Sequence, residues 1–192
     1  MSRRHLTYAL LAYAYCQSIC LAGPADQATR TAAIKPAAVF PALETVPSGV
    51  PRDNADDSAI WIHPADPAKS LIFGTCKNSD SLIFDLSAAS PGEPLPVVQT
   101  LPFKTGNVDV CYNFPLGGER VALFVAFSKT RRNFMAWKVD ETTRQLIDVT
   151  GEGKVAAGGT ALYVSPVSGK YYYLSNQDGV LSQYEMRGDS GK

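Results

Sequence analysis

The sequence predicts an all-β protein built from the blades of a β-propeller. Short strands rich in β-branched and aromatic residues alternate with turns that contain Pro and Gly, of which the chain has 13 and 15. No segment keeps a helical period of hydrophobic residues over several turns. A group of strands recurs about every fifty residues, which is typical of propeller blades. A β-sandwich whose groups are similar by coincidence is the alternative that these observations leave open.

The third strand of each group ends on an aromatic, a polar and an aliphatic residue. These endings are Phe84-Asp85-Leu86, Trp137-Lys138-Val139 and Tyr184-Glu185-Met186. The aromatic residues of successive groups are separated by 53 and 47 positions. In a propeller, such side chains pack between neighbouring blades. We therefore expect the aromatic residues, together with Trp61 on another strand, to lie in the cores between blades rather than to bind a ligand.

The expected strands are short and are bounded by turn residues. The first group comprises residues 59–62, 71–75, 82–86 and 97–101; the second, residues 108–112, 121–126, 135–139 and 145–149; the third, residues 161–164, 171–175 and 181–186. Residues 39–40 and 43–46 suit one further short strand against this body. Propellers contain roughly four to eight blades. We therefore expect the front half of a propeller, as a fragment or a truncated product, with open blade edges through which the chain self-associates.

The N-terminus has the pattern of a secretory signal. Arg3 and Arg4 precede a mostly apolar run over residues 6–21, and small residues at Cys20 and Ala22 suit cleavage after Ala22. The predicted divisions are a signal peptide over residues 1–22, a linker or extended arm over 23–52, and the partial propeller over 53–192. The expected location is extracellular or periplasmic. A membrane anchor is the less favoured alternative, because the run is marginal for a spanning helix.

Composition narrows the classes of function. The chain has 18 basic and 18 acidic residues, so no basic surface for a nucleic acid is expected. Two of the four cysteines lie in the predicted signal, and Cys76 and Cys111 are free to pair in an oxidising compartment. No Cys-x-x-Cys spacing indicates a zinc site. His63 is the one histidine outside the signal, and its place between a strand and Pro64 suits a structural role.

An acidic stretch precedes the first strand. Asp53, Asp56 and Asp57 come directly before residues 59–62. Carboxylates this close together repel one another, so they need either solvent or a hard cation such as Ca²⁺. A solvated acidic turn and a calcium site are both compatible with the stretch alone.

Four blocks of sequence together resemble the β-propeller phytases. They are Asp-Asp-Ser-Ala-Ile-Trp-Ile-His-Pro from Asp56, Gly-Thr-Cys-Lys ending at Lys77, Asn-Val-Asp-Val-Cys-Tyr-Asn-Phe-Pro-Leu-Gly-Gly from Asn107, and Ser-Gly-Lys-Tyr-Tyr-Tyr from Ser168. The similarity extends over about residues 53–186. It implies a six-bladed propeller of which this chain would be about half. It also implies a secreted, calcium-dependent phosphomonoester hydrolase of the 3-phytase type. The implied substrate is phytate as its calcium complex, with no nucleic acid and no stable membrane association.

The resemblance also implies ligands for calcium. The implied metal ligands are Asp56, Asp57, Ser58, Asn107, Val108 and Asp109. The two adjacent carboxylates would lie at the mouth of the channel, and Ser58 and Val108 would contribute backbone oxygens. The family often has Pro at the position of Ser58. From the residues alone, Asn107 and Asp109 would equally suit a turn that starts a strand.

Catalytic and substrate-binding residues follow from the same resemblance. The implied catalytic residues are Lys77, Asp56 and Asp178, and the implied phosphate-binding residues are Lys77, Lys129, Arg131 and Arg132. Solvated surface positions are the alternative for Lys77 and for the basic loop. Lys129 stands where the family has an arginine, and it lacks the planar fork that binds two phosphate oxygens.

Two further departures weaken the case for activity. Gln177-Asp178 stand where the family commonly has Lys-Glu, and Gly158 replaces a tyrosine. With these changes, activity of a truncated chain is expected to be impaired. A non-catalytic propeller module that binds phosphate or calcium is the alternative function.

Overall fold

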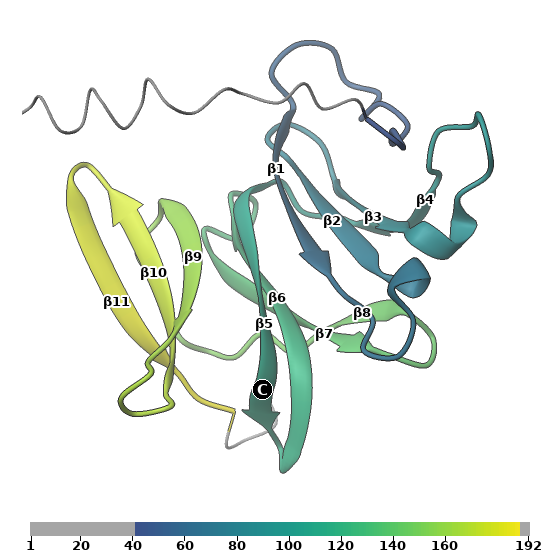
Figure 1. The fold of residues 1–192 in the computed structure, drawn as a ribbon. Helices are drawn as coiled ribbons and strands as arrows, with labels where there is room; N and C mark the ends of the chain where they lie inside the picture. Colours follow the sequence, from purple (N-terminus) through teal and green to yellow (C-terminus); the bar gives the residue numbers. More distant parts are fainter. Residues whose placement is uncertain (1–40, 189–192) are drawn as a thin grey trace, which may run out of the picture. The chain divides into compact units, whose positions relative to one another are not determined.

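The computed structural model describes residues 41–188 of the chain, and all of its sheets are antiparallel (Figure 1). Two sheets of four strands and one of three strands follow one another in chain order. The prediction of an all-β partial propeller is confirmed, and no closed barrel is present among the described residues. The predicted signal peptide, most of the predicted arm and residues 39–40 lie outside the described part. Within residues 41–188, no helix is long and apolar enough to cross a membrane.

The first sheet contains four strands in their sequence order. They are β1 (Ala55–Trp61), β2 (Leu71–Cys76), β3 (Ser81–Asp85) and β4 (Val97–Leu101), with 3-10 turns η1 (Pro67–Lys69) and η2 (Leu86–Ala88). The expectation that Asp56 and Asp57 precede this sheet was wrong. Ala55 pairs with Cys76, so β1 begins before both carboxylates, and its register shifts before Ser58. The backbone N–H of Asp57 donates to Oγ1 of Thr75 at 2.8 Å, which draws the acidic residues into the strand.

The second sheet has the longest strands. They are β5 (Thr105–Leu116), β6 (Glu119–Ser128), β7 (Asn133–Asp140) and β8 (Gln145–Asp148). Asn107 and Asp109 therefore lie inside a strand and not in a turn before it. The first strand of this sheet extends beyond the expected residues 108–112, because Pro115 pairs with Arg120 within the sheet, and the turn consists of Gly117 and Gly118. Both glycines have positive φ, of 58° and 90°, as a tight hairpin requires.

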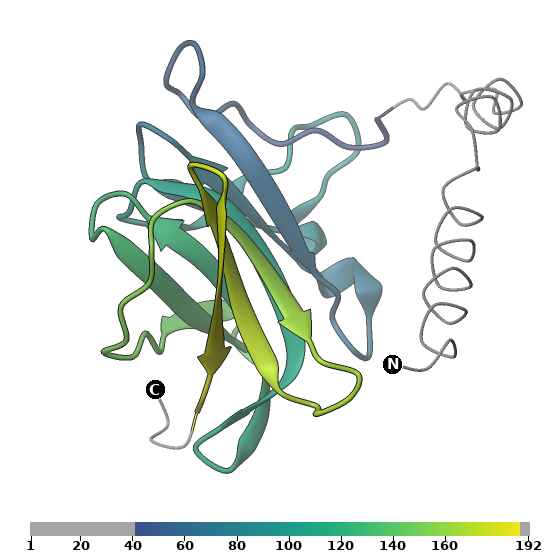
Figure 2. The same cartoon turned by 90° about the vertical axis from the view of Figure 1, so that its left-hand side faces the viewer.

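The third sheet has three strands among the described residues. They are β9 (Gly159–Val164), β10 (Tyr171–Gln177) and β11 (Val180–Met186). Asp178 and Gly179 form the β10–β11 turn with φ of 53° and 77°, a two-residue hairpin of the kind that matches strand twist. Seen from the side of this sheet, its strands lie in front of the second sheet (Figure 2).

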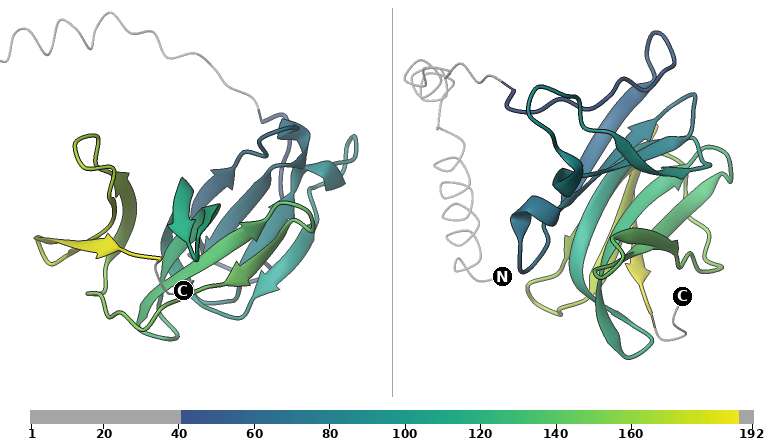
Figure 3. Two further views of the ribbon diagram at one scale, coloured as in Figure 1. Left: turned by 90° about the horizontal axis from the view of Figure 1, so that it is seen from below. Right: turned by 90° about the vertical axis from the view of Figure 1, so that its right-hand side faces the viewer.

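Two hydrophobic cores join the three sheets. Between the first and second sheets, the ring of Phe73 packs against Phe124 and Trp137 at centroid distances of 5.5 and 5.4 Å. Between the second and third sheets, Phe114 packs against Tyr171 at 5.2 Å. Each sheet therefore faces the next as propeller blades do, and Figure 3 shows the three sheets side by side in chain order.

The repeated aromatic residues share one orientation. Trp137 lies in the core toward the first blade, and Tyr184 packs into the core toward the second. Phe84 belongs to neither core, because Ile83 beside it takes the side that faces the second blade. The prediction of packing between blades is confirmed for Trp137 and Tyr184 and wrong for Phe84. The ring of Phe84 instead lies over Gly74 of its own sheet.

Two segments outside the named strands are held by specific hydrogen-bonding contacts. Thr45 forms a parallel bridge with Leu95, so the short strand expected over residues 43–46 is limited to this contact. Nδ1 of His63 accepts the N–H groups of Ala65 and Asp66 at 3.2 Å each, which gives this histidine a structural role in the turn.

Candidate functional site

The innermost strands β1 and β5 carry most of the predicted site. Asp57 of β1 lies against the start of β5. Its Oδ2 accepts the N–H of Val108 at 3.1 Å and approaches Nδ2 of Asn107 at 3.4 Å. Its Oδ1 accepts the N–H of Ser58 at 2.8 Å. Four of the predicted metal ligands therefore lie together. The carboxylate of Asp57 contacts the other three and links the first blade to the second.

Asp109 of β5 makes the same kind of contact one blade further on. Its Oδ1 accepts the N–H of Val110 at 2.7 Å, and its Oδ2 accepts the N–H of Leu162 on β9 at 2.8 Å. Both carboxylate oxygens are therefore occupied by backbone donors from two strands. In the structure Asp109 joins the second blade to the third, and its role as a metal ligand stays a prediction.

Lys77 lies beside the acidic residues at the end of β2. Its ammonium is 3.0 Å from Oδ1 of Asp53 and 3.2 Å from Oδ1 of Asp56. Hydrogen bonds to Asp53 and then Asp56 raise the pKa of Lys77. The lysine is therefore a charged, partly exposed group, and its ammonium is held by two carboxylates.

Gly106 brings a second lysine close to this cluster. A Cβ atom placed on Gly106 would lie 3.7 Å from Oδ2 of Asp56 and 3.9 Å from Cε of Lys129. Lys129 therefore approaches Asp56 from the loop between β6 and β7. Mixed charge thus gathers beside Gly106, with Asp56 on an inner strand and the two lysines on loops.

The other predicted residues point to different surroundings. The guanidinium of Arg131 lies 4.6 Å from the ring centroid of Phe103 and 3.7 Å from the carboxylate of Asp148. Arg132 is exposed with φ of 53° in the same loop, and Asp178 is exposed in the β10–β11 turn. Among the described contacts, none joins Arg131, Arg132 or Asp178 to Lys77.

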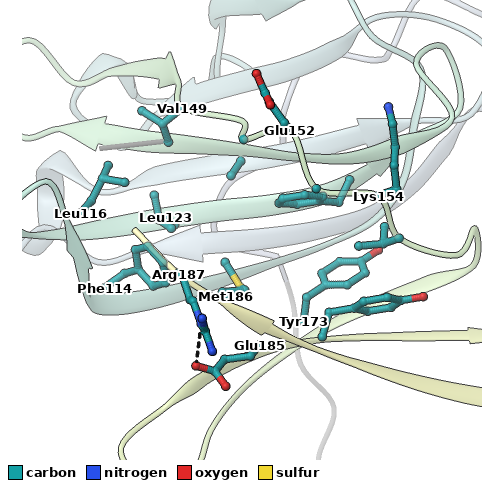
Figure 4. Close-up of a pocket in the computed structure, with 16 residues that line it drawn as sticks. Phe114, Leu116, Leu123, Val149, Glu152, Lys154, Tyr173, Glu185, Met186 and Arg187 are labelled. Carbon is teal, nitrogen blue, oxygen red and sulfur yellow. Dashed lines mark hydrogen bonds and ion pairs between the residues drawn. The ribbon is translucent and has the colours of Figure 1, made fainter. Parts of the chain in front are cut away.

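Two hollows differ in their chemistry. One of about 400 Å³ is lined by Asp56, Asp57 and Ser58 together with residues of β2 and β3. The other, of about 300 Å³, is largely apolar and lies between the second and third blades (Figure 4). Arg187 and Glu185 form an ion pair at its rim. No residue of the predicted site lines this apolar hollow, whereas Asp56, Asp57 and Ser58 line the first, so the candidate functional site is the part of the inner strands around these three residues.

A family model for phytases matches residues 7–192. The chain belongs to the phytase family. It is 30% identical over 159 residues to a 3-phytase of Bacillus subtilis strain 168, an alignment that covers 78% of this chain and 40% of that protein. The phytase-family chain thus spans about two fifths of the length of the curated relative that it matches.

The donor atoms of this phytase-family chain fit a hard cation. Within residues 41–188, no three His, Cys, Asp or Glu side chains are grouped as a metal site. The nearby carboxylates are those of Asp56 and Asp57, and the residues beside them that also carry amide, hydroxyl or carbonyl oxygens are Asn107, Ser58 and Val108. All of these groups offer oxygen atoms, as calcium prefers, and they would supply part of its shell of about six to eight ligands.

The two cysteines of the described residues are buried thiols. Cys76 and Cys111 are free and buried in the structure, so the pairing that the sequence allows is not formed. Burial raises the pKa of Cys111 to about 12. This thiol is therefore protonated near neutral pH and is a poor nucleophile.

Sequence reasoning missed Asn54, a buried residue that fixes the position of Lys77. Only 1% of Asn54 is exposed, and its carbonyl oxygen accepts the N–H of Lys77 at 2.7 Å. An asparagine in an acidic turn carries no sequence signal for burial, because its partners come from a loop more than twenty residues away.

Proposed function

We propose that this chain forms part of a secreted, calcium-dependent phosphomonoesterase that releases phosphate from phytate, of the 3-phytase type. Membership of the phytase family supports this function at the level of the reaction. The observation that carries it is the ion pair of 3.2 Å between Lys77 and Asp56, which puts an anion-binding ammonium beside the cation-binding carboxylates of the inner strand β1.

Basic and acidic residues of the site have different proposed roles. Lys77 donates charge-assisted hydrogen bonds to phosphoryl oxygens, and Lys129 adds a second positive charge. Asp56 and Asp57, with Ser58, Asn107 and Val108, hold calcium. When bound, calcium neutralises phosphate charge and lowers the pKa of a bound water. Because phytate carries many negative charges, both the lysines and the carboxylate-bound cation are needed to seat it.

A non-catalytic module that binds phosphate or calcium is the second candidate. The exposed positions of Arg131, Arg132 and Asp178 favour it, because three residues implied in binding or catalysis do not join the cluster around Lys77. Such a module would keep affinity for the calcium complex of phytate without turning it over.

One experiment separates these functions. The purified full chain is incubated with calcium phytate, and released phosphate is measured with and without a calcium chelator. Calorimetry with the same ligands measures binding, with Lys77→Met as the comparison. Turnover that stops on chelation supports the hydrolase, and binding without turnover supports the module. A folded chain that shows no binding and no turnover would contradict both functions.

Secretion forms a separate part of the proposal. Expression of the full chain in a bacterial host should give a product in the periplasm or medium that begins after Ala22, and N-terminal sequencing would identify it. Retention of Arg3 and Arg4 in the mature product would contradict the predicted signal peptide.

A further inference from the structure

Two carboxylates surround the ammonium of Lys77 in this structure. A lysine ammonium has three N–H donors. Three carboxylate oxygens surround it: Oδ1 and Oδ2 of Asp53 at 3.0 and 3.1 Å, and Oδ1 of Asp56 at 3.2 Å. An incoming phosphoryl oxygen therefore has to share this ammonium with two carboxylates.

The two carboxylates differ in how easily they can leave. The side chain of Asp53 is 79% exposed, whereas that of Asp56 is 22% exposed. Asp56 also belongs to the hollow that holds the predicted cation ligands, and Asp53 does not line it. Asp53 is therefore the carboxylate that yields to an anion.

The buried Asn54 holds the neighbouring Asp53 in position. The amide nitrogen of Asn54 donates to Oγ of Ser48 and of Ser79 at 2.9 and 2.8 Å, and its Oδ1 accepts the N–H of Asn78 at 2.9 Å. The side chain of Asn78 donates to the carbonyl of Asp53 at 3.1 Å. The turn that carries Asp53 and the loop that carries Lys77 are thus fastened together at several points.

We propose that Asp53 is an internal competitor for the ammonium of Lys77, positioned by Asn54, and that it sets the affinity of this site for phosphoryl groups. The proposal rests on the role of Lys77 in the proposed function. Phosphate and carboxylate oxygens compete for the same donors, and both ligands carry negative charge. Asp53 therefore weakens phosphate binding both by occupying donors and by repelling the ligand.

Asp53→Asn tests this competition in the full chain. Exposed ion pairs contribute at most about 1 kcal/mol, so phosphate affinity should rise about two- to fivefold. Calorimetry with phytate in calcium-free buffer measures the change. Asp80→Asn is the matched control, because Asp80 is an exposed carboxylate in the same loop with no described contact to Lys77. Unchanged or weaker binding in Asp53→Asn, with Asp80→Asn like the parent, would overturn the proposal.

A second readout does not depend on phosphate. Nitrogen NMR of lysine ammonium groups reports how fast their hydrogens exchange with water. The Lys77 signal, assigned by its loss in Lys77→Met, should exchange faster in Asp53→Asn and not in Asp80→Asn. Equal exchange in all three proteins would show that Asp53 does not hold the ammonium. If exchange changes but Lys77→Met leaves phytate affinity intact, the contact stands, and the phosphate-binding role of Lys77 in the proposed function fails.

Discussion

The carboxylate of Asp57 accepts the backbone N–H of Val108, 51 positions further along the chain, at 3.1 Å. Asp109 repeats the arrangement with Leu162 of the third blade at 2.8 Å. Innermost strands of neighbouring blades do not pair with one another in a sheet, so these N–H groups need acceptors from side chains. One aspartate on each of the first two inner strands supplies that acceptor.

The first prediction distinguishes a role of Asp109 in linking two blades from a role in calcium binding. Asp109→Asn puts an amide where two N–H donors need acceptors, so it should lower the free energy of unfolding by about 1–3 kcal/mol. Urea denaturation measures this, and Asp178→Asn is the control because its turn position tolerates Asn. Calcium affinity of Asp109→Asn should stay within about twofold of the parent, a shift well below 1 kcal/mol. A large loss of calcium affinity without destabilisation would instead make Asp109 a metal ligand.

The second prediction concerns the position where the family has a tyrosine. Gly158 has φ of 144°, and a Cβ atom there would lie 2.3 Å from the carbonyl oxygen of Asn176. Gly158→Ala should therefore destabilise the chain by about 2–4 kcal/mol through clash and backbone strain. Gly169→Ala, also at positive φ but with open space around it, should cost about 1 kcal/mol. Equal thermal shifts for the two variants would mean that the backbone at Gly158 relaxes freely.

Features that depend on neighbouring residues could be predicted from the sequence, and features that depend on distant residues could not. Strands such as β2 and β10 follow from local alternation and bounding turns, and the sequence located both within two residues. The start of β1 was missed because its polar residues are held by Thr75 on another strand.

The same limit applies to the site. Asp56, Asp57 and Lys77 were placed together by family resemblance, and the structure brings them within one hollow or ion pair. The stacking of Arg131 on Phe103 has no local signal, because Phe103 lies in the connection between β4 and β5 and Arg131 in the β6–β7 loop. Burial of Asn54 likewise depends on a distant loop that the sequence does not place.

The third prediction is a loss of stability in acid. Asp85 is buried between the first two blades and is 2.5 Å from Nε of Arg144. Burial alone would raise its pKa, but hydrogen bonds from Ser87 and Arg144 outweigh this and lower it. A lowered folded-state pKa means that the stabilisation is present above the ordinary carboxyl pKa of about 4 and is lost as pH falls through the lower folded value.

Urea denaturation between pH 6 and pH 3, about the ordinary carboxyl range, tests whether the stabilisation from Asp85 is lost as the pH falls. The parent should be more stable than Asp85→Asn by about 1–3 kcal/mol at the upper end, and the difference should shrink toward the lower end. A difference that stays constant with pH would assign the effect to packing rather than to the charge of Asp85.

The last prediction concerns the two outer faces of the described blades. Ile60 on β1 and Ile62 just after it are 48% and 49% exposed, because Ala59 and Trp61 beside them take the side facing the second blade. On the third blade, Tyr163 and Leu181 are 44% and 70% exposed. Apolar faces beside the unpaired edge of β11 favour self-association of the full chain. Light scattering after gel filtration should show species larger than a monomer, and Leu181→Lys should reduce them. Val167→Lys changes an equally apolar but isolated exposed residue and should have no effect. A parent chain that stays monomeric at high concentration would contradict this association.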